Sequence, residues 1–123
     1  MAMIGRLDLL IIDCPDPAVL ATFYSQVLGT EVYETGDDWA EISSGTSSRP
    51  LIAFQRVDDY NPPGWPSQEV PQQMHLDIKV DDFDVAEPAV LALGATKAGS
   101  ETQTFRVYRD PAGHPFCLIK PQD

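Results

Sequence analysis

The N-terminal sequence LLIIDCPDPAVLATFYSQVLG, residues 9–29, has the signals of a β-strand followed by an α-helix. Apolar and β-branched residues from Leu7 to Cys14 predict the strand, which Pro15 ends because proline has no N–H to donate to a sheet. Asp16 is a typical helix N-cap, and Gly29 is a typical residue after the last turn. Between these caps, one helix face is predicted to carry the apolar residues Val19, Leu20, Phe23, Val27 and Leu28.

Three short extended segments follow this helix. Strands are predicted at about Glu31–Glu34, Trp39–Ser43 and Leu51–Val57, because turn-forming residues separate them. The first half therefore has the element order βαβββ. Four prolines and a glycine follow within residues 58–72 and cannot continue a helix or a central strand, so this segment is predicted to be a linker.

The second half has the same order of elements. A strand is predicted at Met74–Val80, followed by a helix that is capped near Asp82 and stopped at Gly94. Pro88 lies inside this helix and should kink it or delay its start. Three further strands are predicted near Ala95–Gly99, Thr104–Tyr108 and Pro115–Lys120.

The two halves align as an internal repeat. The sequence LLIIDCPD at 9–16 aligns with HLDIKVDD at 75–82, which places the two capping aspartates 66 residues apart. The repeat predicts an α+β fold made of two βαβββ modules. We therefore predict a single domain over residues 1–123, with these parts: module one at about 5–57, the linker at 58–72 and module two at about 73–121.

The composition is that of one globular domain in a reducing compartment. Hydrophobic residues make up 43% and charged residues 22% of the chain, as in ordinary folded proteins. The formal net charge of −11, from 19 acidic against 8 basic residues, argues against nucleic acid or an anionic membrane as a partner. The early apolar run Leu9–Ile12 is too short for a secretory or spanning segment, and Cys14 and Cys117 lack CxxC spacing. We expect a cytoplasmic protein with two free thiols.

Two motifs resemble the vicinal oxygen chelate superfamily, which includes glyoxalase I, ring-cleaving dioxygenases and bleomycin-resistance proteins. The first is DCPDP at 13–17, followed by FY at 23–24 and by LG at the end of the same helix. The second is DPAGHPF at 110–116, the turn before the last strand. Trp65-Pro66, followed by QMHLD at 73–77, is similar to the glyoxalase-like domain group. The resemblance covers nearly the whole chain. It implies two modules that form a cupped mixed sheet, often with a central metal and often as a homodimer.

In metal-using relatives, each module supplies one ligand early in its first strand and one in its last strand. According to the resemblance, the corresponding residues of this sequence are Leu9, Ala53, His75 and Cys117. The internal repeat independently aligns Leu9 with His75 and Ala53 with Cys117. Leu9 and Ala53 have no donor atoms, and Cys117 stands where such relatives usually have glutamate. A catalytic zinc needs three protein ligands. We therefore predict no metal and no other cofactor at this place.

Strand alternation groups the polar residues that could carry chemistry. His75 and Asp77 share one face, and if the family alignment holds, that face is the inside of the cup. His75 with Asp77 could catalyse proton transfer or anchor a ligand; the alternative for His75 is a core histidine bonded to Asp77 or to a backbone carbonyl. We predict that one cavity is lined by His75, Asp77, Asp13, Gln55 and Cys117.

Two tryptophans complete the set of candidates, and separate expectations apply to Cys117 and His114. Trp39 and Trp65 could be aromatic walls for a ligand, although a tryptophan in the position of Trp39 is more often a core residue. Trp65 lies in the linker and is expected to cover a cavity mouth or a dimer contact. Cys117 has no neighbouring cation or helix N-terminus to lower its pKa, so a buried, inert thiol is expected. His114 in the turn before the last strand is expected to be exposed to solvent and receives no role.

Three functions remain open at this point, because a fold alone does not determine an activity. The first is a binding or sequestering protein of the bleomycin-resistance kind, whose acidic surface and apolar cup suit a cationic or aromatic small organic ligand. The second is a metal-independent isomerase, lyase or hydrolase that uses His75 and Asp77. The third is a metal-dependent lyase or dioxygenase, which the ligand count supports least. A homodimer is also expected, because two modules expose sheet edges and an apolar rim.

Overall fold

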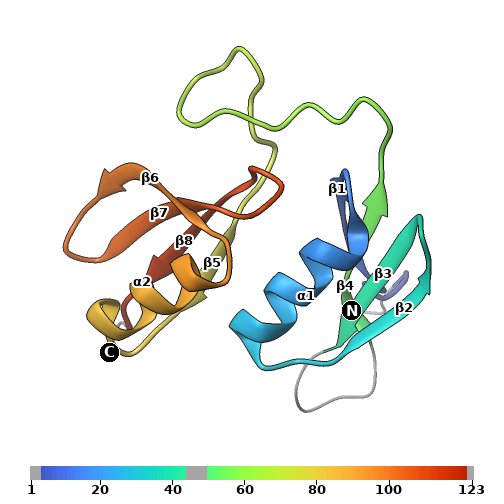
Figure 1. Cartoon of the computed structure of the whole chain (residues 1–123), viewed down its shortest axis with the longest axis horizontal. Helices are drawn as coiled ribbons and strands as arrows, with labels where there is room; N and C mark the ends of the chain where they lie inside the picture. Colours follow the sequence, from blue (N-terminus) through green and yellow to red (C-terminus); the bar gives the residue numbers. More distant parts are fainter. Residues whose placement is uncertain (1–3, 44–49, 122–123) are drawn as a thin grey trace. The chain divides into compact units, whose positions relative to one another are not determined.

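The computed structural model describes residues 4–43 and 50–121, which fall into two units, Met1–Tyr60 and Asn61–Asp123. In the described residues, each unit has one helix and one four-stranded mixed sheet, in the order βαβββ (Figure 1). The predicted fold class, α+β with two βαβββ modules, is therefore confirmed. The two described helices are both too short to cross a bilayer.

The first unit is a sheet with the strand order β1-β4-β3-β2 and a helix, α1, that contacts β3 and β4. Strand β1 runs parallel to β4, and the other neighbouring pairs are antiparallel. The parallel pair is possible because α1 and two strands separate β1 from β4 along the chain. The elements are β1 (Leu10–Cys14), α1 (Pro17–Leu28), β2 (Val32–Gly36), β3 (Trp39–Ser43) and β4 (Pro50–Arg56).

The predicted caps of α1 are confirmed. The side chain of Asp16 accepts hydrogen bonds from the backbone N–H groups of Ala18 and Val19, at 3.2 and 3.4 Å. Gly29 ends the helix in the left-handed conformation, with φ of 68°.

The predicted face of α1 is partly wrong. Val19 is 52% and Leu28 37% exposed. Leu20 and Phe23 are buried as predicted, but Ala21 and Tyr24 are buried with them, and the ring of Tyr24 stacks on Phe54 with centroids 5.8 Å apart. The contact between Tyr24 and the large Phe54 ring helps to fix the rotation of the helix about its axis. The spacing of apolar residues within the helix does not predict this contact.

The second unit has the corresponding strand order, β5-β8-β7-β6, and β5 runs parallel to β8. Residues 61–72, predicted as part of a linker, belong to this unit. The backbone N–H of Gly64 donates to the carbonyl of Val70 at 2.6 Å, which closes a short loop within them. The elements are β5 (Leu76–Lys79), α2 (Phe83–Ala92), β6 (Thr96–Glu101), β7 (Phe105–Arg109) and β8 (Pro115–Ile119).

Helix α2 begins directly after its predicted cap. The side chain of Asp82 accepts a hydrogen bond from the backbone N–H of Asp84 at 2.8 Å, and the first helical residue is Phe83. Pro88 lies inside the helix, so the prediction that it could delay the helix start is wrong. The cap fixes the start, and Pro88 removes one backbone N–H further along without moving it.

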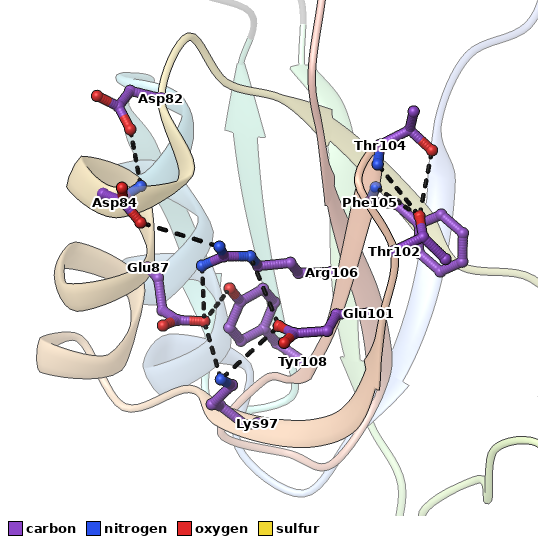
Figure 2. A network of polar contacts seen from close by, with 10 residues as sticks. All are labelled: Asp82, Asp84, Glu87, Lys97, Glu101, Thr102, Thr104, Phe105, Arg106 and Tyr108. Atoms are coloured by element: carbon purple, nitrogen blue, oxygen red, sulfur yellow. Dashed lines mark hydrogen bonds and ion pairs between the residues drawn. The ribbon is translucent and has the colours of Figure 1, made fainter.

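A polar network attaches α2 to β6 and β7 (Figure 2). The carboxylate of Glu87 accepts a hydrogen bond from the buried hydroxyl of Tyr108 at 2.7 Å and lies 3.4 Å from both Arg106 Nη1 and Lys97 Nζ. The hydrogen bond from Tyr108 and the two cations lower the pKa of Glu87. Burial, followed by the interaction with Glu87, raises the pKa of Tyr108. The guanidinium of Arg106 also lies 4.7 Å from the ring centre of Phe83 on α2.

Candidate functional site

Each unit has one parallel strand pair, and the two pairs have corresponding registers. In the second unit Asp77 on β5 is the register partner of Cys117 on β8, and in the first unit Ile11 on β1 is the partner of Ala53 on β4. Ala53 and Cys117, which the internal repeat aligns with each other, thus have corresponding partners in the two units.

Three side chains that could carry chemistry converge in the second unit. His75 directly precedes β5, and its Nε2 lies 3.1 Å from Oδ1 of Asp77. One side-chain donor atom from each of His75, Asp77 and Cys117 lies within 4.8 Å of the others. The His75 side chain is 28% exposed and that of Asp77 is 53% exposed, whereas Cys117 is buried. The predicted convergence of these three residues is thus present in the structure.

A cavity of about 290 Å³ opens beside this cluster. The indole of Trp65 meets the imidazole of His75 edge to face, with centroids 5.0 Å apart and an interplanar angle of 85°. Nδ1 of His75 lies 3.2 Å from Oε1 of Gln72, in the segment that follows Trp65. The cavity is lined by Trp65, His75, Asp77, Thr104, Phe105, Cys117 and Ile119.

The thiol of Cys117 is not activated as a nucleophile. Burial is the largest cause that raises its pKa to about 11, and the charge of Asp77 and a hydrogen bond to that residue add to the effect. The thiol is therefore protonated at neutral pH, as an inert cysteine would be. In a cysteine–histidine dyad the imidazole contacts the thiol. Here the carboxylate of Asp77 interacts with both Cys117 and His75.

The donor set does not fit the metal that the family resemblance implies. The structure adds Asp77 to His75 and Cys117, which gives three donors where the sequence positions alone gave two. However, Asp77 and His75 already bind each other, so a metal at this place would have to displace that contact. At the equivalent positions of the first unit, the side chains are the hydrocarbons of Leu9, Ile11 and Ala53.

The predicted site residues of the first unit form a row of their own. Asp13 on β1 is the register partner of Gln55 on β4, which in turn is the partner of Trp39 on β3. Nε2 of Gln55 donates to Oδ1 of Asp13 at 3.2 Å. The indole N–H of Trp39 donates to Oε2 of Glu41 at 2.7 Å, and Trp39 is half-buried. The structure thus brings Asp13, Gln55 and Trp39 together on neighbouring strands.

The sequence interpretation missed three residues that line the cavity, Thr104, Phe105 and Ile119. Ile119 follows Cys117 by two residues on β8, and Phe105 is its register partner on β7. Both therefore share the face of Cys117. Strand alternation is the sequence signal for Ile119, because residues two apart on a strand lie on the same face.

The expectation that His114 is exposed is wrong. Its side chain is 17% exposed, and Nδ1 lies 2.8 Å from Oδ2 of the fully buried Asp110 side chain. The Asp110 carboxylate also accepts hydrogen bonds from the backbone N–H groups of Ala112 and His114 at 2.9 and 3.0 Å. A buried carboxylate requires several donors, and this turn supplies them by folding the imidazole back onto Asp110.

A family model described as a glyoxalase-like domain matches residues 9–119, a range that includes most of both units. A search of curated proteins found no match.

The chain is also similar to solved structures. An enzyme of the glyoxalase/bleomycin resistance protein/dioxygenase family from Burkholderia phytofirmans PsJN has 20% identity and a TM-score of 0.67, over 94% of this chain and 98% of that chain. The bleomycin-binding protein of Streptomyces verticillus, solved with copper(II)-bleomycin, has 18% identity and a TM-score of 0.56, over 98% and 100%. An antibiotic-binding protein from Streptomyces sp. CB03234 has 18% identity and a TM-score of 0.58, over 99% and 100%.

Proposed function

The chain belongs to the glyoxalase-like domain family of the vicinal oxygen chelate superfamily, and we propose that it is a small-molecule-binding protein that works without a metal centre. The cavity of the second unit carries this proposal. Its volume of about 290 Å³ suits a small organic molecule. Trp65, Phe105 and Ile119 supply apolar walls, and the contact between His75 and Asp77 supplies a polar end.

Two structures with the same fold support binding as the activity. The protein from Streptomyces verticillus binds bleomycin, and the protein from Streptomyces sp. CB03234 binds an antibiotic. Both are matched over nearly the whole of this chain. We infer the same kind of activity here, because the cavity has the apolar walls and few polar groups that ligand sites share.

We assign the residues as follows. His75 and Asp77 form the polar contact of the site, and Trp65 and Cys117 line it. We also propose ligand-contacting roles for Asp13, Gln55 and Trp39, because these residues form a row of polar and aromatic side chains on the sheet of the first unit.

The second candidate function is a metal-independent isomerase, lyase or hydrolase. It is favoured by the 3.1 Å contact between Nε2 of His75 and Oδ1 of Asp77, which is the geometry of an acid–base pair. We do not propose a metal-dependent lyase or dioxygenase, because the equivalent positions of the first unit, Leu9, Ile11 and Ala53, have no donor atoms.

Replacement of His75 by alanine separates binding from catalysis. If the protein binds its ligand, we expect His75→Ala to weaken the affinity by about tenfold or less, because one hydrogen bond is lost from a cavity whose apolar walls remain. Isothermal titration with the molecule that co-purifies with the wild-type chain measures this change. Conversion of that molecule by the wild type, at a rate that falls by about a hundredfold or more in His75→Ala, would contradict binding and support the enzyme.

We further propose a homodimer in the cytoplasm. Cys14 and Cys117 are both buried and are not joined in a disulfide, which suits a reducing compartment. Pairing of two chains would cover exposed sheet edges and apolar side chains such as Ile11, which is 46% exposed.

A further inference from the structure

The charged side chains that line the cavity of the second unit indicate which ligands it can bind. Among its described lining residues, Asp77 is the one acidic side chain, and neither lysine nor arginine is present. The other polar lining groups are the imidazole of His75, the hydroxyl of Thr104 and the thiol of Cys117. Asp77 is thus the anionic group that a ligand would meet.

The Asp77 carboxylate can accept further hydrogen bonds. Its partners within the cavity are the imidazole of His75 at 3.1 Å and the thiol of Cys117. A carboxylate offers about four acceptor positions, so two partners leave room for a donor from a ligand. The Asp77 side chain is 53% exposed, and such a donor can therefore reach it.

The walls beside Asp77 suit a positive charge that is attached to a flat apolar group. The rings of Trp65 and Phe105 both line the cavity, and both are half-buried. Aromatic faces attract ammonium groups through their quadrupole, and tryptophan does so best. The formal net charge of −11 adds a long-range attraction for cations and a repulsion for anions.

We propose that this cavity binds an organic ammonium ion carrying an aromatic group, with the ammonium at Asp77 and the aromatic group against Trp65 and Phe105. The inference rests on the proposed small-molecule-binding function and narrows it to a class of ligand. An ammonium group gives Asp77 a charge-assisted hydrogen bond, whereas a ligand carboxylate would face the Asp77 charge.

Three probes that share one carbon framework test this proposal: 2-phenylethylamine, 2-phenylethanol and phenylacetate. They are titrated into the full chain, and binding is followed by the NMR signals of Trp65 and Phe105. We expect the amine to bind about tenfold or more tightly than the alcohol, and phenylacetate to bind most weakly. Asp77→Asn should reduce the preference for the amine over the alcohol to about onefold, because the charge that distinguishes the two probes is removed.

Two further variants make the test specific. Asp58→Asn removes the same charge from an exposed side chain of the first unit, and it should keep the preference for the amine. Asp77→Glu keeps the carboxylate and should also keep much of the preference. It therefore serves as a second measurement if Asp77→Asn does not fold. A loss in Asp58→Asn as large as in Asp77→Asn would overturn the proposal, because the effect would then come from net charge alone.

The outcomes separate this inference from the function on which it rests. If the alcohol shifts the Trp65 and Phe105 signals with the same affinity as the amine, the ammonium inference is wrong and small-molecule binding stands. If none of the three probes shifts these signals, both the inference and the role of this cavity as a ligand site are overturned.

Discussion

Gly113→Ala is expected to lower the free energy of unfolding by about 3 kcal/mol. Gly113 has φ of 92°, a conformation that side chains with a Cβ rarely adopt, and a Cβ added there would lie 2.9 Å from Cβ of Pro62. The backbone strain and the steric contact both oppose folding. Pro62 lies three residues before Trp65, so we also expect a shift in tryptophan fluorescence as the segment that holds this cavity wall moves. Urea unfolding measures the first effect.

Gly99→Ala is the matched control for this variant. Gly99 has the same φ of 92°, but an added Cβ would meet no atom within 4 Å. We expect a loss of about 1 to 2 kcal/mol, from backbone strain alone. Equal losses in Gly99→Ala and Gly113→Ala would show that the contact with Pro62 does not hold this segment in place.

Glu87→Ala should destabilise the second unit by about 2 kcal/mol. The hydroxyl of Tyr108 would lose its acceptor at 2.7 Å while remaining buried, and Arg106 and Lys97 would lose their shared carboxylate (Figure 2). Unpartnered buried groups cost more than the hydrogen bond itself contributes. Thermal and urea unfolding, compared with wild type, measure the loss.

Two controls locate this effect in the pair of Glu87 and Tyr108. Tyr108→Phe removes the hydroxyl together with its need for an acceptor, so the double variant should cost less than the sum of the two single variants. The folded-state pKa of Glu87 is lowered from 4.5. Its contribution is therefore complete above about pH 4.5 and is lost as the pH falls through the folded pKa. A difference between wild type and Glu87→Ala that stays constant down to pH 3 would contradict this assignment.

Local signals in the sequence were sufficient to predict most of the fold. Asp16 and Asp82 cap their helices as predicted, because an aspartate N-cap needs only nearby backbone N–H groups. The alignment of Ala53 with Cys117 in the repeat agrees with the corresponding registers of β1 on β4 and of β5 on β8. The exposed side of α1 did not follow, because the contact of Tyr24 with Phe54 sets its rotation, and these residues are far apart in sequence. Contacts of this kind leave no local pattern.

Only some residues of the second-unit cavity were predicted from the sequence, namely Trp65, His75, Asp77 and Cys117. Strand alternation placed His75 and Asp77 on one face, and the repeat added Cys117. The sequence could not show that Asp77 interacts with both of the other two, or that Gln72 reaches the imidazole of His75. Those arrangements depend on side-chain rotamers and on the loop after Trp65, neither of which has a sequence signature.

Ligand binding without a metal is tested by native mass spectrometry of the full chain, purified without added metal. We predict a dimer whose mass exceeds that of two 13.5 kDa chains by a small organic molecule, with no stoichiometric zinc, nickel, iron or manganese. The physical reason is that His75 and Asp77 already bind each other and that the equivalent positions of the first unit, Leu9, Ile11 and Ala53, have no donor atoms. A full equivalent of a transition metal per chain, lost in His75→Ala, would contradict this prediction and restore a metal-dependent enzyme as the leading function.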